Sequence, residues 1–451
     1  MANSDMESTR VLKVMEKVFS SKYGLANYLS SSTKRNLIVP SRGNSFTIGN
    51  VTPMFRTIIN RTKGSESSLW AGGGASLMLQ RSRIKAYGEF IERYCAVAES
   101  VPGVVFDSYD NLKANGITCL DPKDVIHFEN CLYENPEFSL KQYIPHRPIS
   151  WVGGKDLVNS KEALVPIQKV LLGYQYPKNE PHFLWGLSTG LACGSSYVQA
   201  SLSAIYEVVE RDSFMLTWLL QIPGTQIHVD KIANKHLEAL YKHVCKHLVG
   251  EDRLYMYDIS KTDGIFTVLT FIRNDLPNAY GLIVSAAFDM DIEIALLKSL
   301  EELCHTQTFA YSTLIGDELR TIQNLKKQDA VDLHKHFFYY STGRNSHCID
   351  FISTTDEHVY LSKLSGAACK SDTNKFESIV DIFRRNGNLV YLVDITKPEI
   401  RDIGLTVVKA VVPGYIDLDI NHNFRQTNNA RLREYQEMHG AELNDNPHPF
   451  P

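Results

Sequence analysis

Two short runs of the sequence combine acidic and basic side chains at one spacing. The pattern E-x-x-E-R occupies residues 89–93 and recurs at residues 207–211, each time inside a mainly apolar helical pattern. On an α-helix, residues three and four apart share a face, so the glutamates and the arginine of each run project together. A single run of this kind is typical of a surface helix with weak ion pairs. Two copies in identical register within apolar surroundings instead predict a functional site.

Four carboxylates in apolar surroundings predict a site for a hard metal ion. The candidate ligands are Glu89, Glu92, Glu207 and Glu210. A buried carboxylate needs a compensating charge, and oxygen ligands favour Mg²⁺ over Zn²⁺. Because Mg²⁺ usually completes its shell with phosphate oxygens, a nucleoside triphosphate is the expected third party. The sequence contains no G-x-x-x-x-G-K-[ST], so we expect a phosphate site built from carboxylates and metal rather than a P-loop.

Long helices must position these side chains. The segments 86–93 and 204–211 keep alanine, both glutamates and arginine in the same register, each after a Gly/Ser-rich turn, which indicates a duplication. Apolar periodicity predicts helices at residues 11–20, 77–98, 197–220, 292–311 and 371–386. Strands are predicted at residues 254–260, 266–273, 280–288 and 389–395, so the chain has α/β character. The N-terminal helix is expected to lead into a polar, Ser-rich connection that extends to about residue 50.

Composition narrows the class of protein. The 451 residues are too many for one small core, and the net charge of −4 without a basic block makes nucleic acid a poor candidate partner. The eight cysteines are scattered without a C-x-x-C pair, which argues against a zinc site or a disulfide framework and favours the cytoplasm. The N-terminus is unlike a signal peptide, and no apolar run is long enough for a membrane span.

The acidic runs and their flanks resemble the YcaO family. The resemblance is carried by KAYGEFIERY at residues 85–94, by the segment 190–212 from GLACGSS to EVVERD, and by shorter matches at 295–302 and 411–414. It implies an α/β (α+β) YcaO fold, in which two pseudo-symmetric halves of mixed sheets place the long acidic helices around a central ATP site. It also divides the chain into an N-terminal extension (1–55), a catalytic domain (56–440) and a C-terminal tail (441–451).

The resemblance implies a role for each site residue. The four glutamates would hold Mg²⁺, while Arg93 and Arg211 would orient the carboxylates or touch phosphate. The implied ATP contacts are Ser76, Lys85, Ser195, Ser196, Gln199, Arg211, Lys298 and Glu302. Ser195 and Ser196 also precede a predicted helix, whose free N–H groups favour an anion. Three positions depart from the family pattern: Gly73 replaces a lysine, Lys85 a serine and Gln199 a glutamate.

The last five residues, PHPFP, form an alternating proline motif. Such a segment cannot enter a helix or an inner strand, so we expect an extended, stiff rod that could be delivered into a site. Among YcaO proteins this motif marks those that form azoline rings, and it implies catalytic roles for Pro447, Pro449 and Pro451. Deleting the five residues is expected to leave the fold intact and abolish ring formation.

The family reaction implied by the resemblance is the cyclodehydration of Cys, Ser or Thr in a ribosomal precursor peptide, as in thiazole/oxazole-modified microcin biosynthesis. ATP phosphorylates the backbone amide oxygen and thereby makes it a good leaving group. Implied partners are an E1-like, leader-binding protein, a flavin-dependent azoline dehydrogenase and a second copy of the chain within a complex. Two alternatives stay open: a YcaO enzyme that forms thioamides, and a non-catalytic scaffold that binds ATP.

Overall fold

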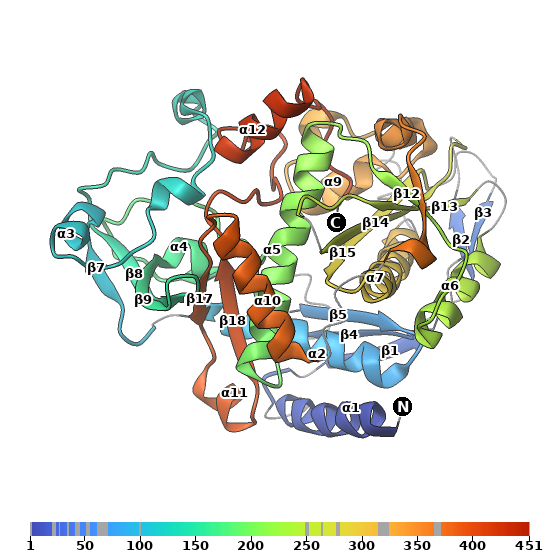
Figure 1. Cartoon of the computed structure of the whole chain (residues 1–451), viewed down its shortest axis with the longest axis horizontal. Coiled ribbons are helices and arrows are strands. Elements are labelled where there is room, and N and C mark those ends of the chain that lie inside the picture. Colours follow the sequence, from blue (N-terminus) through green and yellow to red (C-terminus); the bar gives the residue numbers. More distant parts are fainter. Residues whose placement is uncertain are drawn as a thin grey trace.

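The structure is a computed structural model with mixed α and β architecture (Figure 1). It describes residues 2–19, 24–26, 28–33, 36–40, 46–50, 55–60, 71–98, 101–248, 252–262, 265–276, 280–313, 324–364 and 371–450. Within these residues no helix is long and apolar enough to cross a membrane. The cysteines in the described part are all free.

The two acidic runs lie on long helices that each follow a short, Gly-containing strand. Strand β5 (Ala71–Ser76) leads into α2 (Leu79–Cys95), and β11 (Leu191–Gly194) leads into α5 (Tyr197–Leu219). Ser196 caps α5, since its hydroxyl accepts a hydrogen bond from the Gln199 N–H at 3.2 Å. Both predicted helices are confirmed, and each follows a short strand and a turn in the chain.

One sheet lies beside α5 and extends into the lobe drawn in cyan at the left of Figure 1. Its strand order is β11-β18-β17-β8-β7, with β9 paired to β8, and neighbouring strands are antiparallel. The bounds are Val105–Asp107 (β7), Ile149–Asp156 (β8), Lys161–Pro166 (β9), Tyr391–Asp394 (β17) and Thr406–Val411 (β18). Helix α10 (Asp372–Arg385) packs against α5 through a shared apolar core.

A second sheet lies on the other side of α5. Its order is β15-β14-β13-β12-β16, antiparallel except for the parallel β12–β16 pair. The bounds are Thr225–His228 (β12), Arg253–Asp258 (β13), Phe266–Arg273 (β14), Leu282–Asp289 (β15) and His358–Tyr360 (β16). Helix α7 (Ile292–Thr313) packs on β14 and β15, and α6 (Lys235–His247) packs on α7. The predicted strands and helix of this region are confirmed.

The shorter elements connect these layers. Helices lie at Tyr109–Ala114 (α3), Ile167–Val170 (α4), Leu333–Tyr339 (α9), Pro398–Asp402 (α11) and Ala430–His439 (α12). The small strands β6 (Val97–Ala98) and β10 (Gly173–Tyr174) pair in parallel. Short 3₁₀ helices occupy Glu16–Val18, Pro122–Val125, Asn130–Glu134, Lys327–Asp329, Gly343–Ser353 and Leu361–Lys363.

The predicted polar connection before residue 50 is wrong. After α1 (Ala2–Met15), strands run at Tyr28–Thr33 (β1), Asn36–Pro40 (β2) and Phe46–Asn50 (β3). Strand β1 pairs with β4 (Phe55–Asn60), which pairs with β5, so β1 belongs to the sheet under α2. The serines of β1 obscured its pattern, because strand pairing satisfies the backbone whatever the side chains are. The proposed division at residue 55 stays a prediction.

The C-terminal tail returns to the core beside α5. The indole N–H of Trp218 donates to the Asn446 carbonyl at 3.1 Å, and the Tyr340 hydroxyl donates to the Pro447 carbonyl at 2.5 Å. Phe450 is 3% exposed and packs edge-on against Phe214, with ring centroids 4.8 Å apart. The tail has no regular secondary structure, as expected, but it is buried at its end rather than projecting. Pro451 lies outside the described residues.

Close approach of β5 and α2 depends on glycine. A Cβ added at Gly72 would lie 2.2 Å from the Ala86 carbonyl oxygen, which is helix backbone. We expect Gly72→Ala to push α2 from the sheet and lower the free energy of unfolding by about 1–3 kcal/mol. Gly88→Ala is the matched control within α2, because nothing lies within 4 Å of its added Cβ. Chemical denaturation of both variants checks this, and equal stability would contradict the packing argument.

Candidate functional site

The two acidic runs meet at one cavity. It measures about 340 Å³, and its walls include residues from α2, α5, α7, β15 and the segment before β11. The predicted residues that line it are Glu89, Glu92, Arg93, Glu207, Glu210, Arg211 and Glu302. Phe450, near the end of the C-terminal tail, also lines the cavity. The structure therefore brings together the four predicted metal ligands, both predicted arginines and Phe450 of the tail, whereas the predicted residues Pro447 and Pro449 do not line the cavity.

Three of the glutamates are fixed by backbone N–H groups. Glu89 accepts from the Gly73 N–H at 2.8 Å, and Glu207 accepts from the Gly190 N–H at 3.2 Å. Glu92 accepts at 2.8 Å from the N–H of Cys193, so it joins the first acidic helix to the strand before the second. Each bond stabilises a carboxylate through a group that adds no net charge. The acidic helices are thus held by hydrogen bonds from the strands and the turn that precede them.

Burial makes the negative charge of these carboxylates costly. It raises the pKa of Glu92 to about 8, against the hydrogen bond from Cys193, and Glu207 and Glu89 raise it further. Burial likewise raises the pKa of Glu210 to about 8, although the Arg211 charge opposes the shift. The pKa of Glu207 is raised by burial too, despite Arg211 and Lys409. A bound divalent cation would reverse this balance, so the donor set fits Mg²⁺.

Arg211 has hydrogen-bond donors that no acceptor among the described residues satisfies. Its guanidinium lies 3.7 Å from Glu207 and 3.8 Å from Glu210, and 4.0 Å above the centre of the Phe450 ring. Its Nε and Nη1 are buried and have no hydrogen-bond partner in the described part of the chain. Arg93, by contrast, bonds Glu89 at 3.2 Å. An anion such as a phosphate group would satisfy the donors of Arg211, so the cavity fits a phosphate ligand beside the carboxylates.

Metal ligation itself stays a prediction. Among the residues that the structure describes, no three histidine, cysteine, aspartate or glutamate side chains converge as a preformed metal site. The four glutamates line one cavity, and three of them accept hydrogen bonds from backbone N–H groups.

Most of the other predicted ATP contacts lie outside the cavity lining. Ser76 and Lys85 both bind Glu301, each at 2.8 Å. Lys298 pairs with Asp289 at 2.7 Å. Ser195 and Gln199 bond each other at the start of α5, and Ser196 caps that helix. Nucleotide contacts by these six residues remain predictions, and only Glu302 and Arg211 of the predicted set line the cavity.

His305 is a site residue that the sequence did not reveal. It lines the cavity, and its ring would lie 2.8 Å from a Cβ added at Gly73. Its Nδ1 is 3.5 Å from Glu302. Burial raises the pKa of Glu302, but the hydrogen bond and charge of His305 outweigh it and lower the value to about 2. Glycine at position 73, noted as a departure from the family pattern, therefore leaves room for this imidazole.

A second missed residue is a buried lysine beneath the cavity wall. Lys409 on β18 is 1% exposed, and its ammonium donates to the carbonyls of Leu187 and Thr189, each at 2.6 Å. Both of these residues line the cavity. Burial and the charge of Lys169 lower the pKa of Lys409 to about 7, although Asp417 and Glu207 oppose the shift. Lysine within an apolar strand was the available signal, and only the tertiary structure shows what it holds.

Comparison with known proteins identifies the family. Residues 73–416 match the family described as YcaO cyclodehydratase, ATP- and Mg²⁺-binding, which is well over half of the chain. The chain belongs to the YcaO family. This confirms the family predicted from the paired acidic runs. The family description also names ATP and Mg²⁺, the two cofactors that the sequence predicted.

Three solved structures have folds similar to that of this chain. A heterocyclase in complex with substrate and cofactor has a TM-score of 0.75 at 18% identity, covering 98% of this chain and 57% of that one. YcaO from Methanopyrus kandleri, bound with AMPPCP and Mg²⁺, has a TM-score of 0.60 at 17% identity, covering 92% and 91%. The E. coli microcin synthetase McbBCD complex has a TM-score of 0.60 at 16% identity, covering 92% and 96%. The chain thus spans little more than half of the heterocyclase, and these likenesses confirm the mixed α/β fold.

The raised pKa of Glu92 makes the stability of the metal-free fold depend on pH. The pKa is about 8 in the folded state and 4.5 in the unfolded chain, so the folded state binds the proton more tightly. The free energy of unfolding therefore falls as the pH rises from 4.5 to about 8. We expect Glu92→Gln, without Mg²⁺, to raise the thermal unfolding midpoint above about pH 8 by a few degrees. Near the unfolded pKa the difference should vanish.

Scanning calorimetry with and without Mg²⁺ measures both effects. Mg²⁺ should stabilise the wild type and have little effect on Glu92→Gln. Glu377→Gln, an exposed glutamate on α10, is the control and should behave as the wild type. A variant less stable than the wild type at high pH would contradict the electrostatic account.

Proposed function

We propose that the protein is an ATP-dependent cyclodehydratase that forms thiazolines or oxazolines in a ribosomal precursor peptide. The Cys, Ser or Thr side chain adds to the preceding carbonyl carbon and loses its proton. The resulting oxyanion takes the terminal phosphoryl group of ATP, with release of ADP. Expulsion of phosphate and loss of the amide proton then leave the C=N bond of the ring. The sum is one azoline, ADP and phosphate for each ATP, with the elements of water removed from the peptide.

One observation carries the proposal: the four glutamates share a cavity with Arg211, whose Nε and Nη1 have no hydrogen-bond acceptor among the described residues. Mg²⁺, held by Glu89, Glu92, Glu207 and Glu210, would neutralise the charge of the phosphates. Arg211 would bind a phosphate oxygen, because a guanidinium matches phosphate geometry. Arg93 is already paired with Glu89 and would hold that carboxylate in place. Catalysis would then rest on positioning and charge stabilisation.

Partners follow from the same proposal. The precursor peptide is the substrate, and an E1-like, leader-binding protein would deliver it. The similarity in fold to the McbBCD complex, which is a microcin synthetase, favours work within a multiprotein assembly. A flavin-dependent dehydrogenase would oxidise the azolines, and a second copy of the chain would complete the assembly.

Mass spectrometry of a precursor peptide tests the reaction. In the presence of ATP, Mg²⁺ and the partner, the wild type should remove one water per ring, with one ADP formed each time. Glu207→Gln should abolish both products, because it removes a cavity carboxylate while retaining the acceptor for Gly190. Glu377→Gln, on the outer surface of α10, should retain both.

The alternatives give different products. Exchange of oxygen for sulfur in the peptide would identify a thioamide-forming enzyme. Nucleotide binding without turnover in the full complex would identify a scaffold. Rings formed at the normal rate by Glu207→Gln would refute the assigned carboxylate role.

The tail makes a separate prediction. Truncation would also remove the buried ring of Phe450, so a point substitution tests its role more cleanly. Phe450→Leu keeps apolar volume but removes the aromatic face beneath Arg211, and a desolvated cation–π contact contributes up to about 2 kcal/mol. We expect kcat/KM for ATP to fall by roughly 3- to 30-fold, with stability lowered by less than about 1.5 kcal/mol. Steady-state kinetics and denaturation measure these, and unchanged kinetics would exclude the contact from catalysis.

A further inference from the structure

A second cavity lies apart from the four glutamates. It measures about 540 Å³ and is bounded by the segment 123–143, the turn at Pro413 and Gly414, and the start of α12. It shares no lining residue with the glutamate cavity. Its size falls within the range of ordinary ligand pockets, roughly 300–1,000 Å³. None of the residues assigned above to ATP, Mg²⁺ or catalysis lines it.

Aromatic side chains form one wall of this cavity. The cavity is lined by Phe128, Tyr133 and Tyr143. The ring of Phe128 packs edge-on against Trp185, with ring centroids 5.2 Å apart. Tyr143 is 9% exposed, and its hydroxyl has no hydrogen-bond partner among the residues described. The hydroxyl oxygen itself is buried, so the part of Tyr143 that lines the cavity is apolar. The wall favours a ligand with an apolar group.

The charged side chains of the lining favour an anionic group. They are Lys123, Arg433 and the single carboxylate Asp124. Burial lowers the pKa of His127 to about 4, so this histidine adds no charge at neutral pH. The guanidinium of Arg433 donates to the Asn428 side chain at 2.9 Å and remains exposed to solvent. An exposed, oriented arginine beside an aromatic wall is suited to a carboxylate that neighbours an apolar side chain.

Backbone hydrogen bonds preform the cavity. The Gly414 N–H donates to the Asp124 carbonyl, and the Asn428 N–H donates to the His127 carbonyl, each at 2.8 Å. These bonds tie the segment that carries the aromatic wall to the segment that precedes α12. A ligand would therefore bind without ordering the backbone, which lowers the cost of binding.

The same elements reach the glutamate cavity. Two residues before Arg433, Arg431 on the first turn of α12 binds Asp212 with both Nε and Nη2 at 2.9 Å. Asp212 follows Arg211 directly on α5. Leu418, from the loop between the turn at Gly414 and α12, lines the glutamate cavity itself. Figure 1 shows α12 between the cyan lobe and one end of α5. The same segments, from Gly414 to α12, therefore contribute to both cavities or contact α5 beside them.

We propose that this cavity is a second binding site for the precursor peptide. It takes a segment in which an aromatic or aliphatic side chain neighbours an aspartate or glutamate. Held there, the peptide presents a residue further along its chain to the glutamate cavity, while Arg431 keeps Asp212 and Arg211 in place. The inference rests on the proposed function, because it assumes a peptide substrate. It adds a recognition site that the chemistry alone does not require.

Fluorescence anisotropy with defined peptides tests the site on the full chain. The probe is a fluorescein-labelled Gly/Ser peptide with one Asp-Phe pair and one Cys, in the presence of Mg²⁺ and a non-hydrolysable ATP analogue. Matched peptides carry Lys-Phe or Asp-Ala instead. We expect the Asp-Phe peptide to bind at least about tenfold more tightly than either, the effect of one charge-assisted hydrogen bond or one buried ring.

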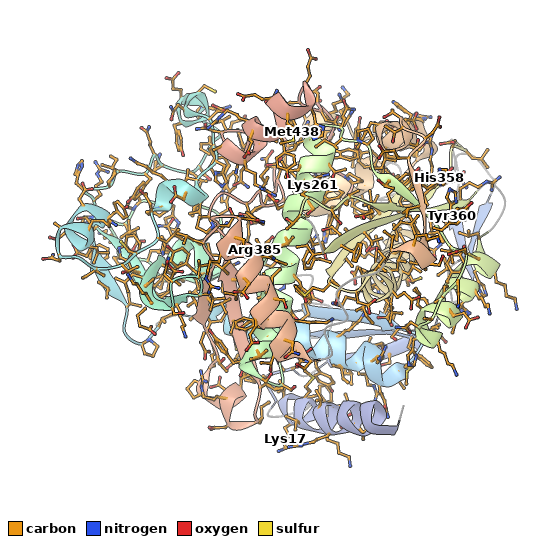
Figure 2. The ribbon with its side chains drawn as sticks, in the orientation of Figure 1. Lys17, Lys261, His358, Tyr360, Arg385 and Met438 are labelled. Carbon is orange, nitrogen blue, oxygen red and sulfur yellow. The ribbon has the colours of Figure 1, made fainter. Side chains whose placement is uncertain are left out.

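Surface substitutions assign the binding to the cavity. Arg433→Ala and Lys123→Ala replace exposed side chains, and each should lower the affinity for the Asp-Phe peptide by about tenfold. Arg385→Ala is the matched control, since Arg385 is an exposed arginine on α10 (Figure 2) and should leave binding unchanged. Affinity for the ATP analogue should be the same in all three variants.

Three outcomes would overturn the inference: no peptide binding, no preference for Asp-Phe, or binding that Arg433→Ala and Lys123→Ala leave intact. The first is also the result expected if the cavity serves a partner protein instead. Glu207→Gln separates this inference from the proposed function. Water loss that requires Glu207 together with absent peptide selectivity would refute the second site alone, whereas water loss without Glu207 would refute the assigned reaction site.

Discussion

The cost of placing the carboxylates of Glu92, Glu207 and Glu210 around one cavity is the constraint on which the site depends. Burial raises the pKa of Glu92, Glu207 and Glu210, so the folded chain disfavours the ionised state that a metal requires. Backbone N–H groups offset part of this cost without adding a cation that would compete with a ligand. Without a metal these carboxylates therefore hold their protons more tightly than free glutamate does, and a divalent cation would shift them to the ionised state that binds it.

This constraint accounts for the architecture around the cavity. A carboxylate on a helix can reach a backbone N–H of a neighbouring strand or turn only if helix and strand lie close together. Gly72 meets that need, because its absent Cβ lets α2 rest directly on β5. On the other side, Lys409 fixes the carbonyls of the loop before β11, and the same loop gives its Gly190 N–H to Glu207. Gly72 thus allows α2 to pack closely on β5, and Lys409 fixes the backbone of the loop before β11.

The sequence predicted the parts of the site that repeat locally. The acidic runs and their helices follow from periodicity, and the strands predicted at residues 254–260, 266–273 and 280–288 follow from apolar runs bounded by turn residues. It did not reveal His305 or Lys409, because their roles depend on segments far apart in the chain. It also misread residues 28–33, where serines occupy a strand whose pairing with β4 supplies the backbone hydrogen bonds. Contacts distant in sequence leave no periodic signal, and so they needed the fold.

The conformation of the tail follows from its composition, whereas its position follows from packing. Alternating prolines keep the segment extended, which the sequence made plain. What brings it to the cavity is burial, since Phe450 packs on Phe214 and beneath the guanidinium of Arg211. An aromatic face can attract this cation without accepting its hydrogen bonds, so Nε and Nη1 stay available for a ligand. A carboxylate at the same place would have accepted hydrogen bonds from the arginine. The aromatic residue at position 450 therefore holds the guanidinium in position without occupying its hydrogen-bond donors.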